Sequence, residues 1–188
     1  ALKADLPKVE LGGTVIVNTD AFDERNLAKA GYESNPIEDG TLDGYTMITS
    51  PMTSLTKEIC KDIGVKPRDA ERSKNFFALG LVSWLYSRPE EPTMLWIDEK
   101  FSGKELIVAA NKAAYKAGHA FGETAELSAS RLAVRPAELA AGTYTNINGN
   151  TALSWGLVAG SQLAGLPIFL GSYPITPASD ILHELAKH

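Results

Sequence analysis

A short proline-bounded turn near the carboxyl end of the chain presents the hydroxyl group that is best placed to bind a ligand. In this turn, YPITP at 173–177, Pro174 and Pro177 fix the backbone φ angle, and the residue before each proline is held extended. The Thr176 hydroxyl and the N–H groups of a following helix start can therefore hold an anion such as a carboxylate. A rigid turn that only caps the next helix fits these residues equally well.

Three polar residues after the first apolar run form a second candidate. Asn18, Thr19 and Asp20 follow TVIV, at the carboxyl end of a predicted buried strand, where open α/β sheets usually bind ligands. The same residue types are the usual caps in front of a helix. We favour capping of the helix predicted over 21–30, because this is their commonest role.

Other catalytic and metal-binding patterns are missing from the sequence. It contains no GxGxxG or GxxxxGK[ST] phosphate loop, no HExxH motif and no GxSxG motif. Cys60 is the only cysteine, which excludes an Fe–S cluster or a Cys-rich zinc site held by this chain. We expect it to be a buried, inert thiol. The three histidines are far apart, and none has a second ligand at metal-binding spacing.

The composition is that of a soluble globular protein with a mildly acidic balance. The 188 residues carry a formal net charge of −5 and are 44% hydrophobic, which allows a sizeable core. This charge argues against nucleic acid or an anionic membrane as the main partner. No stretch approaches the roughly 20 consecutive apolar residues of a membrane span, and the first residues lack the apolar core of a signal peptide. We therefore expect a cytoplasmic protein.

Strands and helices alternate in the first part of the chain. The β-branched run at 14–18 predicts a strand buried on both faces, as in a parallel sheet. A helix over 21–30 should end at Gly31, and a second strand is predicted over 44–50. An amphipathic helix over 52–63 should follow.

The next stretch is dominated by helices. We expect a loop at 64–73, and then a buried helix at 73–86 that is apolar on all sides. Gly80 within it costs roughly 1 kcal/mol relative to alanine, which suggests close packing at that position. Residues 94–98 fit either a short strand or the first turn of a helix, and a long helix is expected from Phe101 onward. The order predicts a partial three-layer α/β domain with a parallel-rich sheet.

The character of the sequence changes after this domain. We divide the chain into a domain at 1–122, a polar, Ala-rich linker at 123–148, and the start of a second α/β domain at 149–188. Within 149–188 we expect a helix capped by Asn150 or Thr151 and ended by Gly165. A short buried strand over 168–170 and a helix starting at Thr176 or Ser179 should follow. Such a helix–strand–helix unit cannot bury its own faces.

Two motifs in this last part resemble a known enzyme family. The combination GNTALSWGLVAG and YPITPASDI is similar to the opening of the pyrimidine-binding domain of 2-oxoacid:ferredoxin oxidoreductases, over about forty residues. The earlier stretches GGTVIVNTD and SKNFFALG resemble the C-terminal portion of that family's gamma domain. This gamma-then-alpha order resembles the large (alpha) subunit of the two-subunit enzymes, especially those acting on 2-oxoglutarate. The chain is therefore expected to be a fragment, inactive alone.

The resemblance implies roles for the residues of the turn. Thr176 corresponds to the family threonine that contacts the substrate carboxylate, and Tyr173, Pro174 and Ile175 shape that substrate-binding turn. The sequence departs from the family at Thr151, where many members have glutamate. The glutamate that contacts thiamine and an arginine expected to aid substrate binding would lie beyond the last residue. No cofactor-binding or metal-binding residue is assigned within the chain.

The resemblance also implies a reaction and its partners. The parent enzyme would decarboxylate a 2-oxoacid with thiamine diphosphate, pass electrons through an Fe–S cluster to ferredoxin, and transfer the acyl group to coenzyme A. Mg²⁺ and the Fe–S cluster would be held by a beta subunit, and none of these cofactors is expected in this fragment. Two alternatives remain open: a non-catalytic α/β module that assembles subunits, and a transketolase-like thiamine enzyme.

Overall fold

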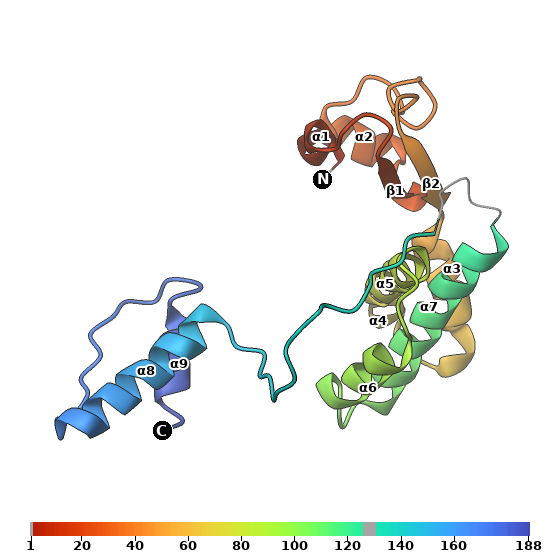
Figure 1. Ribbon diagram of the computed structural model, residues 1–188. Helices are drawn as coiled ribbons and strands as arrows, with labels where there is room; N and C mark the ends of the chain where they lie inside the picture. Colours follow the sequence, from red (N-terminus) through yellow and green to blue (C-terminus); the bar gives the residue numbers. More distant parts are fainter. Residues whose placement is uncertain (1, 126–130) are drawn as a thin grey trace. The chain divides into compact units, whose positions relative to one another are not determined.

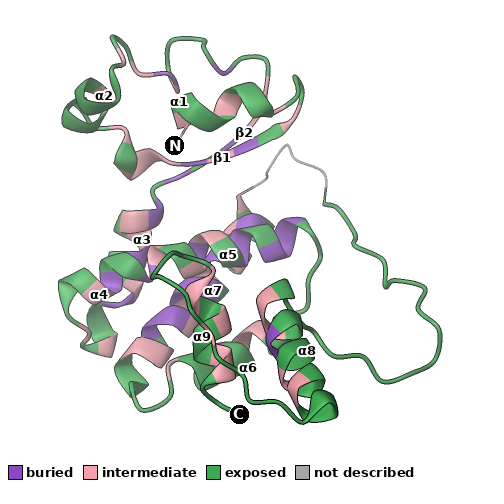
Figure 2. Cartoon of the chain, turned by 90° about the vertical axis from the view of Figure 1, so that its left-hand side faces the viewer, coloured by how far each residue is buried: buried purple, intermediate pink, exposed green. Residues whose placement is uncertain are grey.

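The computed structural model describes residues 2–125 and 131–188, and the chain forms two compact units (Figure 1). The first unit ends at Pro136 and the second runs from Ala137 to His188. Figure 2 shows that buried residues gather on the strands and along the long helices of the first unit, whereas most of the second unit is exposed.

A small parallel sheet lies at the amino end of the first unit. Strand β1 (Thr14–Asn18) pairs in parallel with β2 (Thr46–Ser50), with Thr14 opposite Thr46 and Asn18 opposite Ser50. The buried β-branched residues Val15, Val17 and Ile48 explain why these segments are strands. The predicted α/β class with parallel pairing is confirmed.

Short helical elements surround this sheet. The segment between the strands contains α2 (Glu24–Ala30), whose start is capped by the Asp23 carboxylate, which accepts a hydrogen bond from the Asn26 N–H at 2.8 Å. The helix ends at Gly31, as predicted, because this residue adopts a left-handed conformation with φ of 70°. The other short elements here are α1 (Leu2–Asp5) and the 3₁₀ turns η1 (Leu6–Lys8) and η2 (Thr19–Ala21).

Two long helices form the core of the first unit. Helix α5 (Lys74–Leu85) packs along α7 (Glu105–Thr124), and Phe77, Leu81 and Tyr115 are almost fully buried between them. Gly80 confirms the predicted close packing, because a Cβ atom placed there would lie 2.0 Å from the Tyr115 carbonyl oxygen. Gly118 of α7 makes the reciprocal approach, with 1.9 Å between its virtual Cβ and the Phe77 carbonyl oxygen. The two glycines bring the helix backbones together.

Several predicted boundaries in this unit are wrong. The loop expected at 64–73 contains α4 (Pro67–Arg72), because proline at the first helical position sets the φ angle that a helix needs. The helix expected over 52–63 is divided into α3 (Met52–Ile59) and the 3₁₀ turn η3 (Lys61–Ile63). Residues 94–98, expected as a short strand or a first helical turn, lie in the middle of α6 (Glu91–Lys100). The helix expected from Phe101 onward is α7, and it begins only at Glu105, after a turn in which Gly103 has a φ of 78°.

An extended segment after α7 is fixed to the end of α5. The Arg131 guanidinium lies 5.4 Å from the centre of the Trp84 ring, and its Nε donates to the Trp84 carbonyl oxygen at 3.3 Å. The Leu132 N–H donates to the Leu85 carbonyl oxygen at 2.7 Å. Residues 131–134 therefore form a strap on this unit. Part of the predicted linker, at 126–130, lies outside the described residues.

The second unit consists of two helices joined by an extended connection. Helix α8 (Gly149–Ala164) ends at Gly165 in the left-handed conformation, as predicted, and α9 (Ser179–Leu185) packs along it. The strand expected over 168–170 is absent, and Phe169 is 93% exposed. The segment is extended, but no neighbouring strand in this unit pairs with its backbone. Over the ranges that the structure describes, no helix combines the length and apolar character needed to cross a bilayer.

Candidate functional site

The two motifs of the second unit meet at the proline-bounded turn. The Asn150 side chain donates from Nδ2 to the carbonyl oxygen of Pro177 at 3.0 Å, which fixes the turn to the first turn of α8. Asn148, rather than the predicted Asn150 or Thr151, caps the helix, because its Oδ1 accepts from the Thr151 N–H at 2.9 Å. This arrangement leaves the Asn150 amide available for the turn.

Polar contacts one helical turn further on hold α9 against α8. The Ser154 hydroxyl is fully buried and lies 2.8 Å from the Asn150 carbonyl oxygen and 3.4 Å from that of Ile181. The Trp155 indole N–H donates to the Glu184 carboxylate at 3.3 Å. A small buried serine allows the two helices to approach closely. The turn between 171 and 178 therefore lies next to two helices that are fixed to each other.

The turn itself presents its side chains outward. The Ile175 carbonyl oxygen accepts from the Ser179 N–H at 3.0 Å and starts α9, and the Thr176–Pro177 peptide bond is cis. Thr176 is exposed, and Tyr173 and Ile175 are 72% and 50% exposed. A neutral hydroxyl in this position can donate a hydrogen bond to a carboxylate, but it cannot act as a general base near neutral pH.

The carboxylates of α9, the helix that follows the turn, are Asp180 and Glu184. Asp180 lies in the first turn of α9, and Lys187 at its end pairs with the Glu184 carboxylate. That hydrogen bond, followed by weaker contributions from Trp155 and His188, holds the pKa of Glu184 below its ordinary value. Lys187 is therefore already engaged, and a carboxylate ligand at Thr176 would need a positive charge from another part of the protein.

The carboxyl edge of the sheet is closed by side chains of the protein itself. Asn18 donates from Nδ2 to the Thr53 hydroxyl at 2.8 Å. The Asp20 carboxylate accepts from the Ser54 N–H at 2.7 Å and from the Ser54 hydroxyl at 2.8 Å. Asp20 thus satisfies an N–H group in the first turn of α3, on the neighbouring strand's side of the sheet. The prediction that this group caps the helix next in sequence is wrong, because Asp23 does so.

The remaining sequence candidates carry no site chemistry. Cys60 is 2% exposed, as predicted, and burial raises the pKa of its thiol, which keeps it protonated. Within residues 2–125 and 131–188, no group of three or more His, Cys, Asp or Glu side chains could hold a metal ion.

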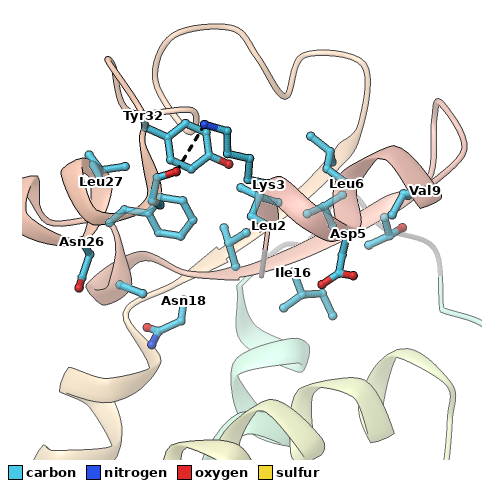
Figure 3. Close-up of a pocket in the computed structure, with 16 residues that line it drawn as sticks. Leu2, Lys3, Asp5, Leu6, Val9, Ile16, Asn18, Asn26, Leu27 and Tyr32 are labelled. Atoms are coloured by element: carbon cyan, nitrogen blue, oxygen red, sulfur yellow. Dashed lines mark hydrogen bonds between the residues drawn. The ribbon is translucent and has the colours of Figure 1, made fainter.

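A cavity that sequence reasoning did not predict lies against β1. It has a volume of about 520 Å³ and is lined mainly by apolar side chains such as Leu6, Ile16 and Leu27 (Figure 3). At its rim the Lys3 ammonium lies 5.0 Å from the centre of the Tyr32 ring and donates to the Gly31 carbonyl oxygen at 2.7 Å. All the lining residues lie between Leu2 and Tyr32, in α1, β1, α2 and the segments that join them, but no motif in this stretch indicated a cavity.

Comparisons with known proteins are consistent along the whole chain. The family model "Pyruvate ferredoxin/flavodoxin oxidoreductase" matches residues 1–121. The 2-oxoglutarate oxidoreductase subunit KorA of Mycobacterium tuberculosis is 53% identical over 188 residues, which are 100% of this chain and 29% of that protein.

A solved structure supports the same relationship. It is described as "2-oxoglutarate:ferredoxin oxidoreductase from Magnetococcus marinus with 2-oxoglutarate, coenzyme A and succinyl-CoA bound". The TM-score is 0.64 at 26% sequence identity, and the match covers 100% of this chain and 28% of that one. The chain thus spans less than a third of the length of the relatives it matches. The resemblance noted in the sequence is confirmed, and the chain belongs to the pyruvate ferredoxin/flavodoxin oxidoreductase family.

Proposed function

We propose that this chain is part of the alpha subunit of an enzyme that oxidatively decarboxylates 2-oxoglutarate to its coenzyme A thioester and passes the electrons to ferredoxin. The observation that carries this proposal is the 53% identity to the KorA subunit, which extends over both units of the chain. The alternative of a non-catalytic assembly module explains the sheet and the long helices, but it gives no reason for an exposed, tightly held turn beside α9.

The second unit supports a substrate-binding role for its proline-bounded turn. Asn150 fixes the Pro177 carbonyl oxygen, and Ser179 fixes that of Ile175, so the intervening Thr176 is held between two anchored positions. A preorganised hydroxyl loses little conformational entropy when it donates to a carboxylate. We assign Thr176 as an anchor for the substrate carboxylate, with Tyr173, Pro174 and Ile175 shaping the turn around it.

The residues of this turn fit the edge of a thiamine diphosphate site. Tyr173 and Ile175 offer an exposed apolar rim against which a flat ring can lie. When bound, thiamine diphosphate supplies the electron sink for decarboxylation. This chain's own contribution would be to orient the acid by its carboxylate. We place Mg²⁺ and the Fe–S cluster on a partner beta subunit, and ferredoxin and coenzyme A as the reactants of the complete enzyme.

The choice of acid can be tested on the full-length protein purified with its partner subunit. Coenzyme A-dependent reduction of a viologen dye would be measured with 2-oxoglutarate and, separately, with pyruvate. We expect turnover with 2-oxoglutarate to exceed that with pyruvate. A preference for pyruvate would overturn the substrate assignment but retain the reaction class. A folded complex that contains thiamine diphosphate and the Fe–S cluster but oxidises neither acid would overturn the proposed function.

A further inference from the structure

A side chain of α8, that of Asn150, ties the proline-bounded turn to this helix. Its Nδ2 group donates to the Pro177 carbonyl oxygen at 3.0 Å and joins residues 27 positions apart. The backbone contacts of the turn are more local. The Ser179 N–H donates to the Ile175 carbonyl oxygen at 3.0 Å, and the Asp180 N–H donates to the Pro177 carbonyl oxygen at 3.1 Å. These two bonds fix the turn to the start of α9, whereas Asn150 fixes it to α8.

The composition of the turn explains why a side-chain donor matters there. Pro174 and Pro177 have no N–H, so hydrogen bonds can hold these residues only through their carbonyl oxygens. A carbonyl oxygen has two lone pairs, and that of Pro177 accepts from both Asp180 and Asn150. Thr176 precedes Pro177 directly and is exposed, so burial does not hold it in place. Its position therefore depends on how well its neighbours are anchored.

Asn150 is itself held in an ordered part of the second unit. Its carbonyl oxygen lies 2.8 Å from the hydroxyl of Ser154, which is fully buried. The start of α8 is capped by a different residue, because the Asn148 Oδ1 accepts from the Thr151 N–H at 2.9 Å. The Asn150 amide is therefore not needed to cap the helix, and its contact with Pro177 serves the turn.

We propose that Asn150 is a positioning residue for substrate binding, which holds the turn so that the Thr176 hydroxyl meets the carboxylate of the 2-oxoacid. This inference rests on the proposed function, in which Thr176 anchors that carboxylate. Asn150 acts through Thr176 and does not touch the acid. Without its contact, the turn occupies additional arrangements that cannot bind the acid. The apparent affinity then falls by the fraction of molecules that remain competent to bind.

The effect should be on the KM for the acid rather than on kcat. The carboxylate is already charged when the acid binds, so its hydrogen bond to Thr176 is present before the reaction. Loss of an interaction that is made on binding raises KM and leaves kcat nearly unchanged. A general loss of folded protein would instead lower the apparent kcat, because fewer molecules would be active, and would leave KM unchanged.

The first test measures the KM for 2-oxoglutarate in viologen reduction by the full-length complex. We expect Asn150→Ala to raise it about threefold to tenfold, as for the loss of one hydrogen bond, with the KM for coenzyme A unchanged. Asn148→Ala is the matched control, because it removes an asparagine side chain from the same helix start but leaves the contact with Pro177. Equal KM increases in the two variants, or no increase in Asn150→Ala, would overturn the proposal.

An isosteric variant keeps the proposal testable if Asn150→Ala does not assemble. Asn150→Asp preserves the size of the side chain, but a carboxylate cannot donate to the Pro177 carbonyl oxygen. We expect its KM for 2-oxoglutarate to rise at least as much as in Asn150→Ala. Thr151→Asp is the control for the added negative charge, one residue further along α8, and it should raise the KM less. An equal rise in Thr151→Asp would show an effect of charge alone and would contradict the role of Asn150.

A double-mutant cycle separates this proposal from the proposed function. Once Thr176→Val has removed the hydroxyl, adding Asn150→Ala should raise the KM little further, whereas two independent effects would multiply. If Thr176→Val alone leaves the KM unchanged, the proposed role of Thr176 fails, and this inference fails with it. If Thr176→Val raises the KM and the effect of Asn150→Ala multiplies with it, the role of Asn150 is overturned and that of Thr176 stands.

Discussion

Two single residues determine how closely helices α5 and α7 pack against each other. Gly80 and Gly118 are needed because α5 and α7 pack backbone to backbone, and any side chain at these positions would overlap a carbonyl oxygen. The sequence indicated Gly80, since a glycine within an apolar helix is costly without a packing reason. It did not indicate Gly118, which lies in an Ala-rich helix where small residues are common.

We predict that Gly80→Ala destabilises the first unit by about 1–3 kcal/mol or more, because the new methyl group forces the helices apart. Gly156→Ala is a suitable control, since a Cβ atom at this helical position meets nothing within 4 Å. It should instead stabilise α8 by about 0.5–1 kcal/mol. Hydrogen exchange of each helix in the full-length protein measures both effects, and equal protection of α5 in the wild type and Gly80→Ala would contradict the packing argument.

Elements, rather than residues, explain why several predictions were wrong. The polar group at 18–20 was expected to cap the helix next in sequence, but Asp20 instead accepts from the Ser54 N–H at the start of α3, because it reaches Ser54 across the parallel strands. The expected strand at 168–170 is a run of three apolar residues, but a strand also needs a neighbour for its backbone hydrogen bonds. Local sequence reports what a segment can form, and only the surrounding elements determine its pairing.

The attachment of the strap at 131–134 to the end of α5 can be tested by substitution. Arg131→Ala removes the contact with the Trp84 ring, worth about 0.5–1 kcal/mol, and a hydrogen bond of similar value. We expect the Leu132 amide, which donates to the Leu85 carbonyl oxygen, to exchange its hydrogen several-fold faster. Arg135→Ala is the control, since Arg135 is exposed and lies beyond the residues that contact α5. Unchanged exchange in Arg131→Ala would show that Leu132 is held independently of the guanidinium.

At the scale of the whole molecule, the two units differ in how much of their fold the sequence predicted. The α/β class, both strands and the long helices of the first unit follow from hydrophobic patterning. In the second unit, the motifs located the turn, but not the link through which Asn150 holds Pro177, because that contact joins residues 27 positions apart. The cavity against β1 was missed entirely, since its mainly apolar lining carries no motif.

The central claim is that Thr176 of this turn binds the carboxylate of 2-oxoglutarate. The most direct measurement is the KM for 2-oxoglutarate in viologen reduction by the full-length complex carrying Thr176→Val. Ser172→Ala is the control that removes a hydroxyl four residues earlier in the same connection. We predict a KM increase of about tenfold or more for Thr176→Val, because the carboxylate loses a charge-assisted hydrogen bond, and little change for Ser172→Ala. An unchanged KM and kcat in Thr176→Val would contradict the claim and leave the threonine as a turn residue.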